Sequence, residues 1–223
     1  MIDSRSDRFF SPKKRPYTSE GTNWFSIDNR VLDIESDLAK NGILFLEDRG
    51  TDETGGTAFS YVRKEIMRIF KPFDVSNQSL IGTKESPIEL YINTEGGPVN
   101  EAFALYDDIL RLRRLHGLYI EMIVEGFAFS GGALVLQAGW RRYMTPNSLL
   151  MIHGLQVEGV GGTIHELDID VDMIHEMNRN MVKIFAKRMK MDFKILEKRL
   201  QREDWYFTPK EALKYNLIDE IIR

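Results

Sequence analysis

The residue types and spacings that could do chemistry in this sequence centre on one serine and one histidine. Ser130 lies in the run Gly126-Phe-Ala-Phe-Ser-Gly-Gly, and His153 follows the apolar run 149–152. A serine hydroxyl is a strong nucleophile only when a base takes its proton, and a third group must hold that base in the right tautomer. The transition state also needs hydrogen-bond donors aimed at the oxyanion that develops. The pattern therefore indicates acyl transfer by a serine–histidine pair.

Two glycine pairs could supply these donors. Gly131 and Gly132 directly follow Ser130 and would leave free helix-start N–H groups beside it, and Gly96-Gly97 forms a second turn. All three features follow predicted strands, and sites in α/β proteins usually form at the carboxyl ends of strands. Each feature alone is usually structural, so the residues by themselves leave a serine–histidine hydrolase and a structural role equally open.

The elements that must position these residues alternate between strand and helix. The apolar patterns predict strands at 43–46, 88–93, 119–124, 142–145 and 148–152, and helices at 58–70, 98–110 and 132–138. Pro98 is expected as the first residue of its helix, where its missing N–H costs nothing. This order predicts an α/β fold built from βαβ units.

Two helix starts near the end of the chain carry the capping-box pattern, a threonine with a glutamate three residues later. They are Thr163 with Glu166 and Thr208 with Glu211. The first opens a long helix that we expect to reach about Met189, and its apolar stripe predicts a core or subunit contact.

Composition excludes several classes of function. The 223 residues are 43% apolar and carry a net charge of −4, so they predict a globular protein with no general affinity for nucleic acid. The chain has no Cys, its four His show no metal-ligand spacing, and no apolar run reaches the ~18 residues of a membrane span. We expect no metal, no cofactor and no membrane contact, a cytoplasmic location, a flexible arm at 1–23 and a single domain at 24–223.

Four blocks of the sequence resemble the Clp proteolytic subunit, the ClpP family of serine peptidases. The blocks are LYINTEGG, GFAFSGGALVLQAG, TPNSLLMIHG and EDWYFTPKEALKYNLIDEI, and the likeness runs from about residue 42 to 223. The resemblance implies a ClpP/crotonase-like α/β fold of repeated βαβ units with a long protruding handle helix. It also implies a serine endopeptidase that cuts unfolded proteins or peptides inside a ring-shaped chamber.

The resemblance carries over roles residue by residue. It implies Ser130 as the nucleophile, His153 as the general base and Asp204 as the acid that orients this base. It further implies an oxyanion hole formed by the backbone N–H groups of Gly97 and Gly131.

The acidic member of this triad depends on the resemblance alone. The chain holds 34 acidic residues, and Glu203 and Asp219 are the nearest rivals of Asp204. The resemblance also implies that a Gly-rich strand at 157–162 lines the substrate channel before the long helix begins.

The resemblance has consequences for partners as well. Members of the family form a heptameric ring, and two rings stack through the long helix into a tetradecamer. An ATP-driven unfoldase docks on apolar clefts of the ring. Glu89 and Glu125 stand where these clefts usually have an aromatic residue and a methionine, and they predict that standard docking of an unfoldase fails.

Two other functions stay open. A ring-forming structural subunit with reduced activity would not need Ser130, His153 and Asp204, and all three are intact. A crotonase-like acyl-CoA enzyme would share the fold and the oxyanion hole, but the sequence offers no second carboxylate pair for proton transfer. Labelling by a fluorophosphonate probe separates the peptidase from both.

Overall fold

The computed structural model describes residues 29–48, 57–70, 80–157 and 161–222. The arm expected at 1–23 and the beginning of the domain expected at 24–223 lie outside these residues. The central residues of the strand expected at 157–162 lie outside them too.

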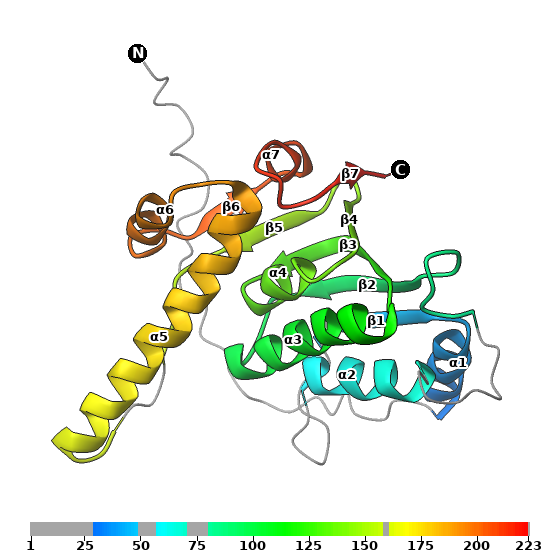
Figure 1. Cartoon of the computed structure of the whole chain (residues 1–223), viewed down its shortest axis with the longest axis horizontal. Coiled ribbons are helices and arrows are strands. Elements are labelled where there is room, and N and C mark those ends of the chain that lie inside the picture. Colours follow the sequence, from blue (N-terminus) through cyan, green and yellow to red (C-terminus); the bar gives the residue numbers. More distant parts are fainter. Residues whose placement is uncertain (1–28, 49–56, 71–79, 158–160, 223) are drawn as a thin grey trace, which may run out of the picture.

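Strands and helices alternate along the chain, as the apolar patterns predict. The strands are β1 (Ile43–Glu47), β2 (Ile88–Thr94), β3 (Ile120–Phe129), β4 (Arg141–Met144), β5 (Leu149–Ile152), β6 (Trp205–Phe207) and β7 (Glu220–Ile221). The helices are α1 (Asn29–Lys40), α2 (Ala58–Ile69), α3 (Val99–His116), α4 (Gly131–Leu136), α5 (Ile164–Met189), α6 (Phe193–Leu200) and α7 (Pro209–Lys214). Figure 1 shows α2, α3 and α4 on the same side of the central sheet. The α/β architecture agrees with the expected fold class.

The central sheet is parallel and branches at its longest strand. Its order is β1-β2-β3-β4-β7, and β5 pairs with β3 on a separate branch. The first half of β3 pairs with β4 up to Val124, whereas its last residues, 127–129, pair with β5. Strand β6 then adds to β5 in the antiparallel direction. The ends of β3 and β5 and the start of β6 are thereby brought together.

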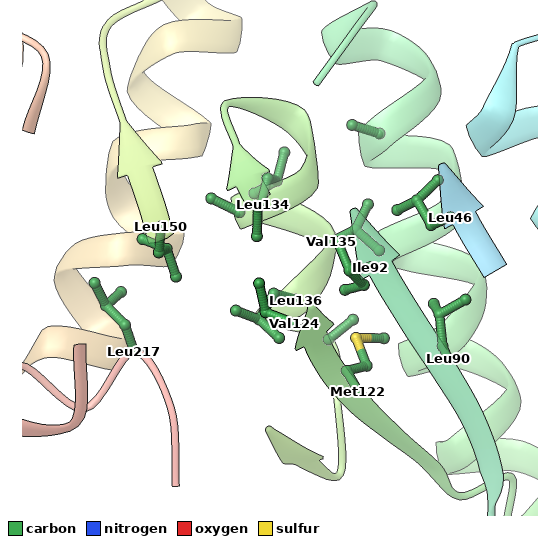
Figure 2. Close-up of a cluster of buried hydrophobic side chains, with 14 of the residues drawn as sticks. Leu46, Leu90, Ile92, Met122, Val124, Leu134, Val135, Leu136, Leu150 and Leu217 are labelled. Carbon is green, nitrogen blue, oxygen red and sulfur yellow. The ribbon is translucent and has the colours of Figure 1, made fainter. Parts of the chain in front are cut away.

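The core lies on the side of the sheet that the helices cover. In β2 the alternate residues Ile88, Leu90 and Ile92 are fully buried, whereas Glu89 and Tyr91 between them are partly exposed. This alternation follows from the pleat of a strand, which sends successive side chains to opposite faces. Figure 2 shows side chains of α4 packed among those of β1, β2 and β3, which fixes the helix that follows Ser130.

Three predictions from the sequence need correction, and one helix was not predicted. The strand predicted at 119–124 continues to Phe129, so Ser130 follows a strand directly. Pro98 is the residue before α3 and not its first helical residue. Val157, Gly161 and Gly162 are not in a strand, and the sequence patterns gave no indication of α1.

Helix α5 begins and ends as expected and projects away from the sheet (Figure 1). Both hydrogen bonds of its capping box are present, between Thr163 and Glu166. Its second half packs on the core through Met181 and Phe185. Its first half leaves Ile164 80% exposed and Met173 55% exposed, because the helix extends beyond the sheet there.

Candidate active site

Ser130 occupies a sharp corner between β3 and α4. Its backbone has φ 50° and ψ −116°, a positive φ that side chains other than glycine rarely adopt. Its N–H donates to the Met151 carbonyl at 2.9 Å, and its own carbonyl accepts the first hydrogen bond of α4, from Leu134, at 3.1 Å. Strained backbone of this kind is frequent at functional sites.

An irregularity in the β2–β3 pairing prepares this corner. The register shifts between Ile92 and Thr94, and the Asn93 side chain accepts a hydrogen bond from the Phe127 N–H at 3.1 Å across the gap. A Cβ on Gly126 would lie 2.4 Å from Asn93 Oδ1, so only glycine fits there. The bulge turns the end of β3 from β4 to β5, and this change of partner brings the Ser130 corner next to the end of β5, which precedes His153.

The Gly96-Gly97 turn packs directly against the serine corner. A Cβ added to Gly96 would lie 2.8 Å from Ser130 Cβ and 3.2 Å from the Gly131 nitrogen. Asp48 holds the turn, because it accepts hydrogen bonds from the Thr94 hydroxyl and, at 2.7 Å, from the Glu95 N–H. The two glycine turns of the sequence therefore meet at one place.

Phe59 of α2 supports both glycine turns from behind. Its ring lies 3.0 Å from the position of a Cβ on Gly97 and equally close to one on Gly131, and it is 1% exposed. On the other side, a Cβ on Gly132 would lie 2.5 Å from Thr94 Cγ2. Within the described residues, the N–H groups of Gly97 and Gly131 have no acceptor. Two free backbone donors beside a serine are what an oxyanion requires.

His153 directly follows β5, one strand away from Ser130. Met151 is paired with Phe129, and its carbonyl is the one that holds the Ser130 N–H. His153 thus leaves its strand two residues beyond the contact that fixes the serine. Its Nδ1 atom is buried and has no hydrogen-bond partner in the described part of the chain. An unpaired buried nitrogen of this kind costs about 1–3 kcal/mol, so it favours any partner that can reach it.

Asp204 lies opposite His153 at the end of the β5–β6 ladder. The last pair of this antiparallel ladder is Ile152 with Trp205, so the next residues outward on the two strands are His153 and Asp204. The Asp204 side chain is exposed and makes no ion pair with a described residue. Burial, and after it the Asp204 charge, raise the pKa of Tyr206.

The two rivals of Asp204 are engaged with arginines. Asp219 forms an ion pair with Arg142 at 2.5 Å, and Glu203 forms one with Arg199 at 2.8 Å. Of the three acids that the sequence left in competition, Asp204 is the one that the strand pairing brings to the histidine.

A hollow of about 560 Å³ begins immediately beyond the histidine. Gly154 and Leu155 form one wall, Asp204 lies at its edge, and Ile174 and Asn178 of α5 line the opposite side. Asn178 fixes the chain there by accepting a hydrogen bond from the Leu155 N–H at 3.0 Å. A hollow of this size could hold part of an extended peptide.

Three residues that support the site were not predicted from the sequence. Asp48 bonds Thr94 and Glu95, which are 46 and 47 residues away along the chain. Phe59 packs on Gly97 and Gly131, and Asn93 contacts Gly126 and bonds Phe127, which is 34 residues away. The glycines themselves carried a signal, because each marks a close backbone approach. What approaches them is decided only by the fold.

No group of metal-binding side chains occurs within residues 29–48, 57–70, 80–157 and 161–222. In the same segments no helix is long and apolar enough to cross a membrane.

An α/β sheet with a serine corner, a histidine and two free backbone donors at adjoining strand ends defines a hydrolase of the serine type. The sequence model of the Clp protease family matches residues 78–223. The chain is also 31% identical over 209 residues to the ATP-dependent Clp protease proteolytic subunit of Deinococcus radiodurans, covering 93% of this chain and 91% of the relative. The chain belongs to the Clp protease family, and its activity is that of a serine endopeptidase.

Proposed function

We propose that Ser130, His153 and Asp204 form the catalytic triad of this peptidase, with the N–H groups of Gly97 and Gly131 as the oxyanion hole. The observation that carries the proposal is the strand pairing, in which Phe129 is paired with Met151 and Ile152 with Trp205. Phe129 directly precedes Ser130, Ile152 directly precedes His153, and Trp205 directly follows Asp204. That the three residues adjoin neighbouring strand ends supports the proposal.

The proposed reaction begins when Ser130 Oγ attacks the carbonyl carbon of the scissile peptide bond. His153 Nε2 accepts the Ser130 proton and then gives it to the leaving amine. The negative oxygen of the tetrahedral intermediate accepts hydrogen bonds from Gly97 and Gly131, which have no competing acceptor among the described residues. Removing one such donor in a serine protease costs about 100- to 1,000-fold in turnover. Water then hydrolyses the acyl-serine by the same steps.

Asp204 completes the triad by accepting the Nδ1–H bond of His153. The residue with the exposed carboxylate and the residue with the buried, unpartnered Nδ1 atom occupy opposing positions just beyond one ladder. Rotation of the Asp204 side chain would satisfy the nitrogen and fix the imidazole tautomer in which Nε2 is free to take a proton. Binding of a peptide in the adjoining hollow is a step that could favour this rotation, since Asp204 is part of its lining.

The decisive experiment uses Ser130→Ala with a fluorophosphonate probe. The wild-type chain should be labelled on the peptide that contains Ser130, and Ser130→Ala should lose both the label and at least about a thousandfold in peptide hydrolysis. The unfolding midpoint should be unchanged, because no hydrogen bond of the Ser130 hydroxyl holds the described structure together. Near wild-type turnover in Ser130→Ala would mean that the nucleophile is another residue.

We further propose that the chain assembles into a ring of seven and that α5 joins two rings. The exposed half of α5 carries large apolar side chains that nothing in the described chain covers. They are Ile164 and Val171 on one side of the helix and Ile169 and Met173 on the other, each 46% to 80% exposed. A helix that projects from its own core needs a second surface to cover such side chains.

Native mass tests this assembly. One ring of seven copies of the 25.9 kDa chain has a mass of about 181 kDa, and a double ring about 363 kDa. Ile169→Lys with Met173→Lys should convert the larger species into the smaller one. A monomer at all concentrations would be incompatible with a closed chamber.

The remaining proposals concern substrate and partner. The relative from Deinococcus radiodurans is named as ATP-dependent, so we propose unfolded polypeptides as substrates and an ATP-driven unfoldase as partner. The cytoplasmic location stays a prediction from the sequence. Glu89 and Glu125 bear on how such an unfoldase would dock, because they would place two carboxylates on its docking surface.

A further inference from the structure

A hollow that takes no part in the proposed chemistry lies between α3, the end of α5 and the buried side of β4. Its volume is about 620 Å³. Six cationic side chains line it, and no carboxylate of a described residue does. They are Arg113, Arg142, Lys183, Lys187, Arg188 and Lys190. The chain as a whole carries a net charge of −4, so this concentration of positive charge is not a consequence of composition.

Arg142 forms a rigid floor for this hollow. It is 5% exposed and donates to Asp219, to the Gln137 side chain at 2.8 Å and to the Asn216 carbonyl at 3.0 Å. Its charge is already matched by Asp219. The other five cations line the hollow and form no ion pair with a residue that the structure describes.

Arg188 and Arg113 lie half-buried in this positive field. Arg188 donates to the Gln137 carbonyl, a neutral acceptor. Burial, and after it the charge of Arg142, lower the pKa of Arg188, and burial lowers the pKa of Arg113. Neither guanidinium forms an ion pair with any residue in the described segments. The Asp219 charge acts on Arg188 in the opposite direction but does not outweigh burial, since the pKa of Arg188 is still lowered. Partly dehydrated cations that lack an ion-pair partner are costly, and an anion that enters the hollow would reduce this cost.

The remaining walls suit a ligand with more than a charged group. Leu110, Ile184 and the half-buried Tyr106 provide an apolar side. A second hollow of about 450 Å³ shares Tyr106, Lys183 and Ile184 with the first. It adds Phe103 and Met177 together with the polar residues Asp107 and Asn180. The cationic hollow thus adjoins one that is partly aromatic and apolar and that contains one carboxylate, which disfavours phosphate there.

We propose that the hollow between α3 and α5 is a binding site for a compact polyanion that carries a chain of phosphate groups. Guanidinium groups match the geometry of phosphate oxygens, and lysines add point charges around them. The guanidinium groups of Arg113 and Arg188 lie beside the fixed Arg142, and the lysines that line the hollow are exposed. This arrangement fits several linked phosphates better than a single anion. Inorganic polyphosphate and a nucleoside triphosphate share this chemistry, and the second would also fill the neighbouring apolar hollow.

The test is calorimetric titration of the assembled protein with inorganic tripolyphosphate and, separately, with adenosine triphosphate at low ionic strength. Both should bind once per chain and weaken as salt rises. Lys183→Gln with Lys187→Gln should weaken both at least about tenfold, since it removes two of the positive charges that line the hollow. Phe103→Ala should weaken only the nucleotide if its base enters the apolar hollow, and neither ligand if the site takes the phosphate chain alone.

Lys194→Gln with Lys210→Gln is the matched control. It removes the same charge from two exposed lysines that line neither of these two hollows, and it should change affinity less than about twofold. An equal loss in both double variants would show a general charge effect and refute the site. If citrate bound as tightly as tripolyphosphate, the hollow would not be specific for phosphate groups, and the proposal would be refuted. Loss of native mass in Lys183→Gln with Lys187→Gln would identify the hollow as a contact between copies instead. The readout is binding, so the outcome does not depend on the triad.

Discussion

At the scale of residues, the choice of Asp204 over its rivals can be tested by one matched series. Asp204→Asn should lower turnover by about 10⁴-fold while the fold persists, because the amide would favour the wrong histidine tautomer. Glu203→Gln should retain most activity, since Glu203 is itself exposed and pairs with the partly buried Arg199. Kinetic assays with a short fluorogenic peptide measure both.

Asp219→Asn gives the opposite pattern in this series. Asp219 accepts hydrogen bonds from the buried Arg142, so its loss should destabilise the fold by about 3–5 kcal/mol. Activity per folded molecule should survive. If Asp219→Asn folded normally and lost turnover, the acid of the triad would be Asp219.

A second prediction at this scale concerns Tyr91 and the pH dependence of stability. Tyr91 donates to Glu89 at 2.8 Å, and this hydrogen bond raises the pKa of Tyr91 to about 12. The folded pKa lies above the unfolded value of about 10, so the contribution is complete below pH 10 and disappears as pH rises to about 12. Tyr91→Phe should therefore be less stable than wild type at pH 8, and this difference should vanish near pH 12. Urea denaturation at several pH values measures it, and a constant difference across that range would contradict the hydrogen bond.

At the scale of elements, the two capping boxes have the same sequence pattern, but one begins a helix packed on the core and the other begins a helix turn that stands clear of it. Helix α7 buries Pro209 and Ala212, so Thr208→Ala should lower the free energy of unfolding by about 1 kcal/mol. The first turns of α5 stand clear of the core, and fraying there is not coupled to global unfolding. Thr163→Ala should keep the urea midpoint and raise the concentration at which double rings separate. If Thr163→Ala and Thr208→Ala lowered the urea midpoint equally, α5 would be packed along its whole length.

Most elements were predictable from the sequence because their signals are local. Alternating apolar residues mark β2, and the threonine–glutamate pairs mark the starts of α5 and α7. The end of β3 was not predictable in this way. Gly126 resembles a strand terminator, but the Asn93 side chain bridges the break and the strand continues to Phe129 beside β5.

The candidate site was predictable only in part for the same reason. Ser130 and His153 stand out because their neighbours form a glycine turn and an apolar strand. Asp204 has no such local mark, and the antiparallel pairing of Ile152 with Trp205 is what distinguishes it. Contacts between distant segments depend on the fold and leave little trace in local sequence.

At the scale of the whole molecule, the face of the sheet opposite the helices carries both aromatic and acidic side chains. Tyr91 stacks on Phe45 with ring centres 5.6 Å apart, and Glu89 and Glu125 lie beside them. Glu125 is exposed, whereas Glu89 is half-buried and bound by the Tyr91 hydroxyl. An apolar anchor on this face would have to cover at least one carboxylate.

The last prediction follows from this arrangement and concerns a bacterial unfoldase that uses an apolar anchor. Covering an unpaired carboxylate costs several kcal/mol or forces its protonation. In a ring the cost recurs at every subunit, so even ~1 kcal/mol per site removes most of a multivalent affinity. The unmodified assembly, mixed with such an unfoldase and ATP, should fail to degrade a tagged folded substrate, although it cuts short peptides.

Glu89→Tyr with Glu125→Met should restore ATP-dependent degradation, because it provides apolar surface and removes both charges. Glu89→Gln with Glu125→Gln separates these two effects, since it removes the charges and leaves the face polar. Rescue by the first double variant alone would show that apolar contact is limiting, and rescue by both would show that charge is. Efficient degradation by the unmodified protein would refute the prediction, because the two acids would then leave the docking surface usable.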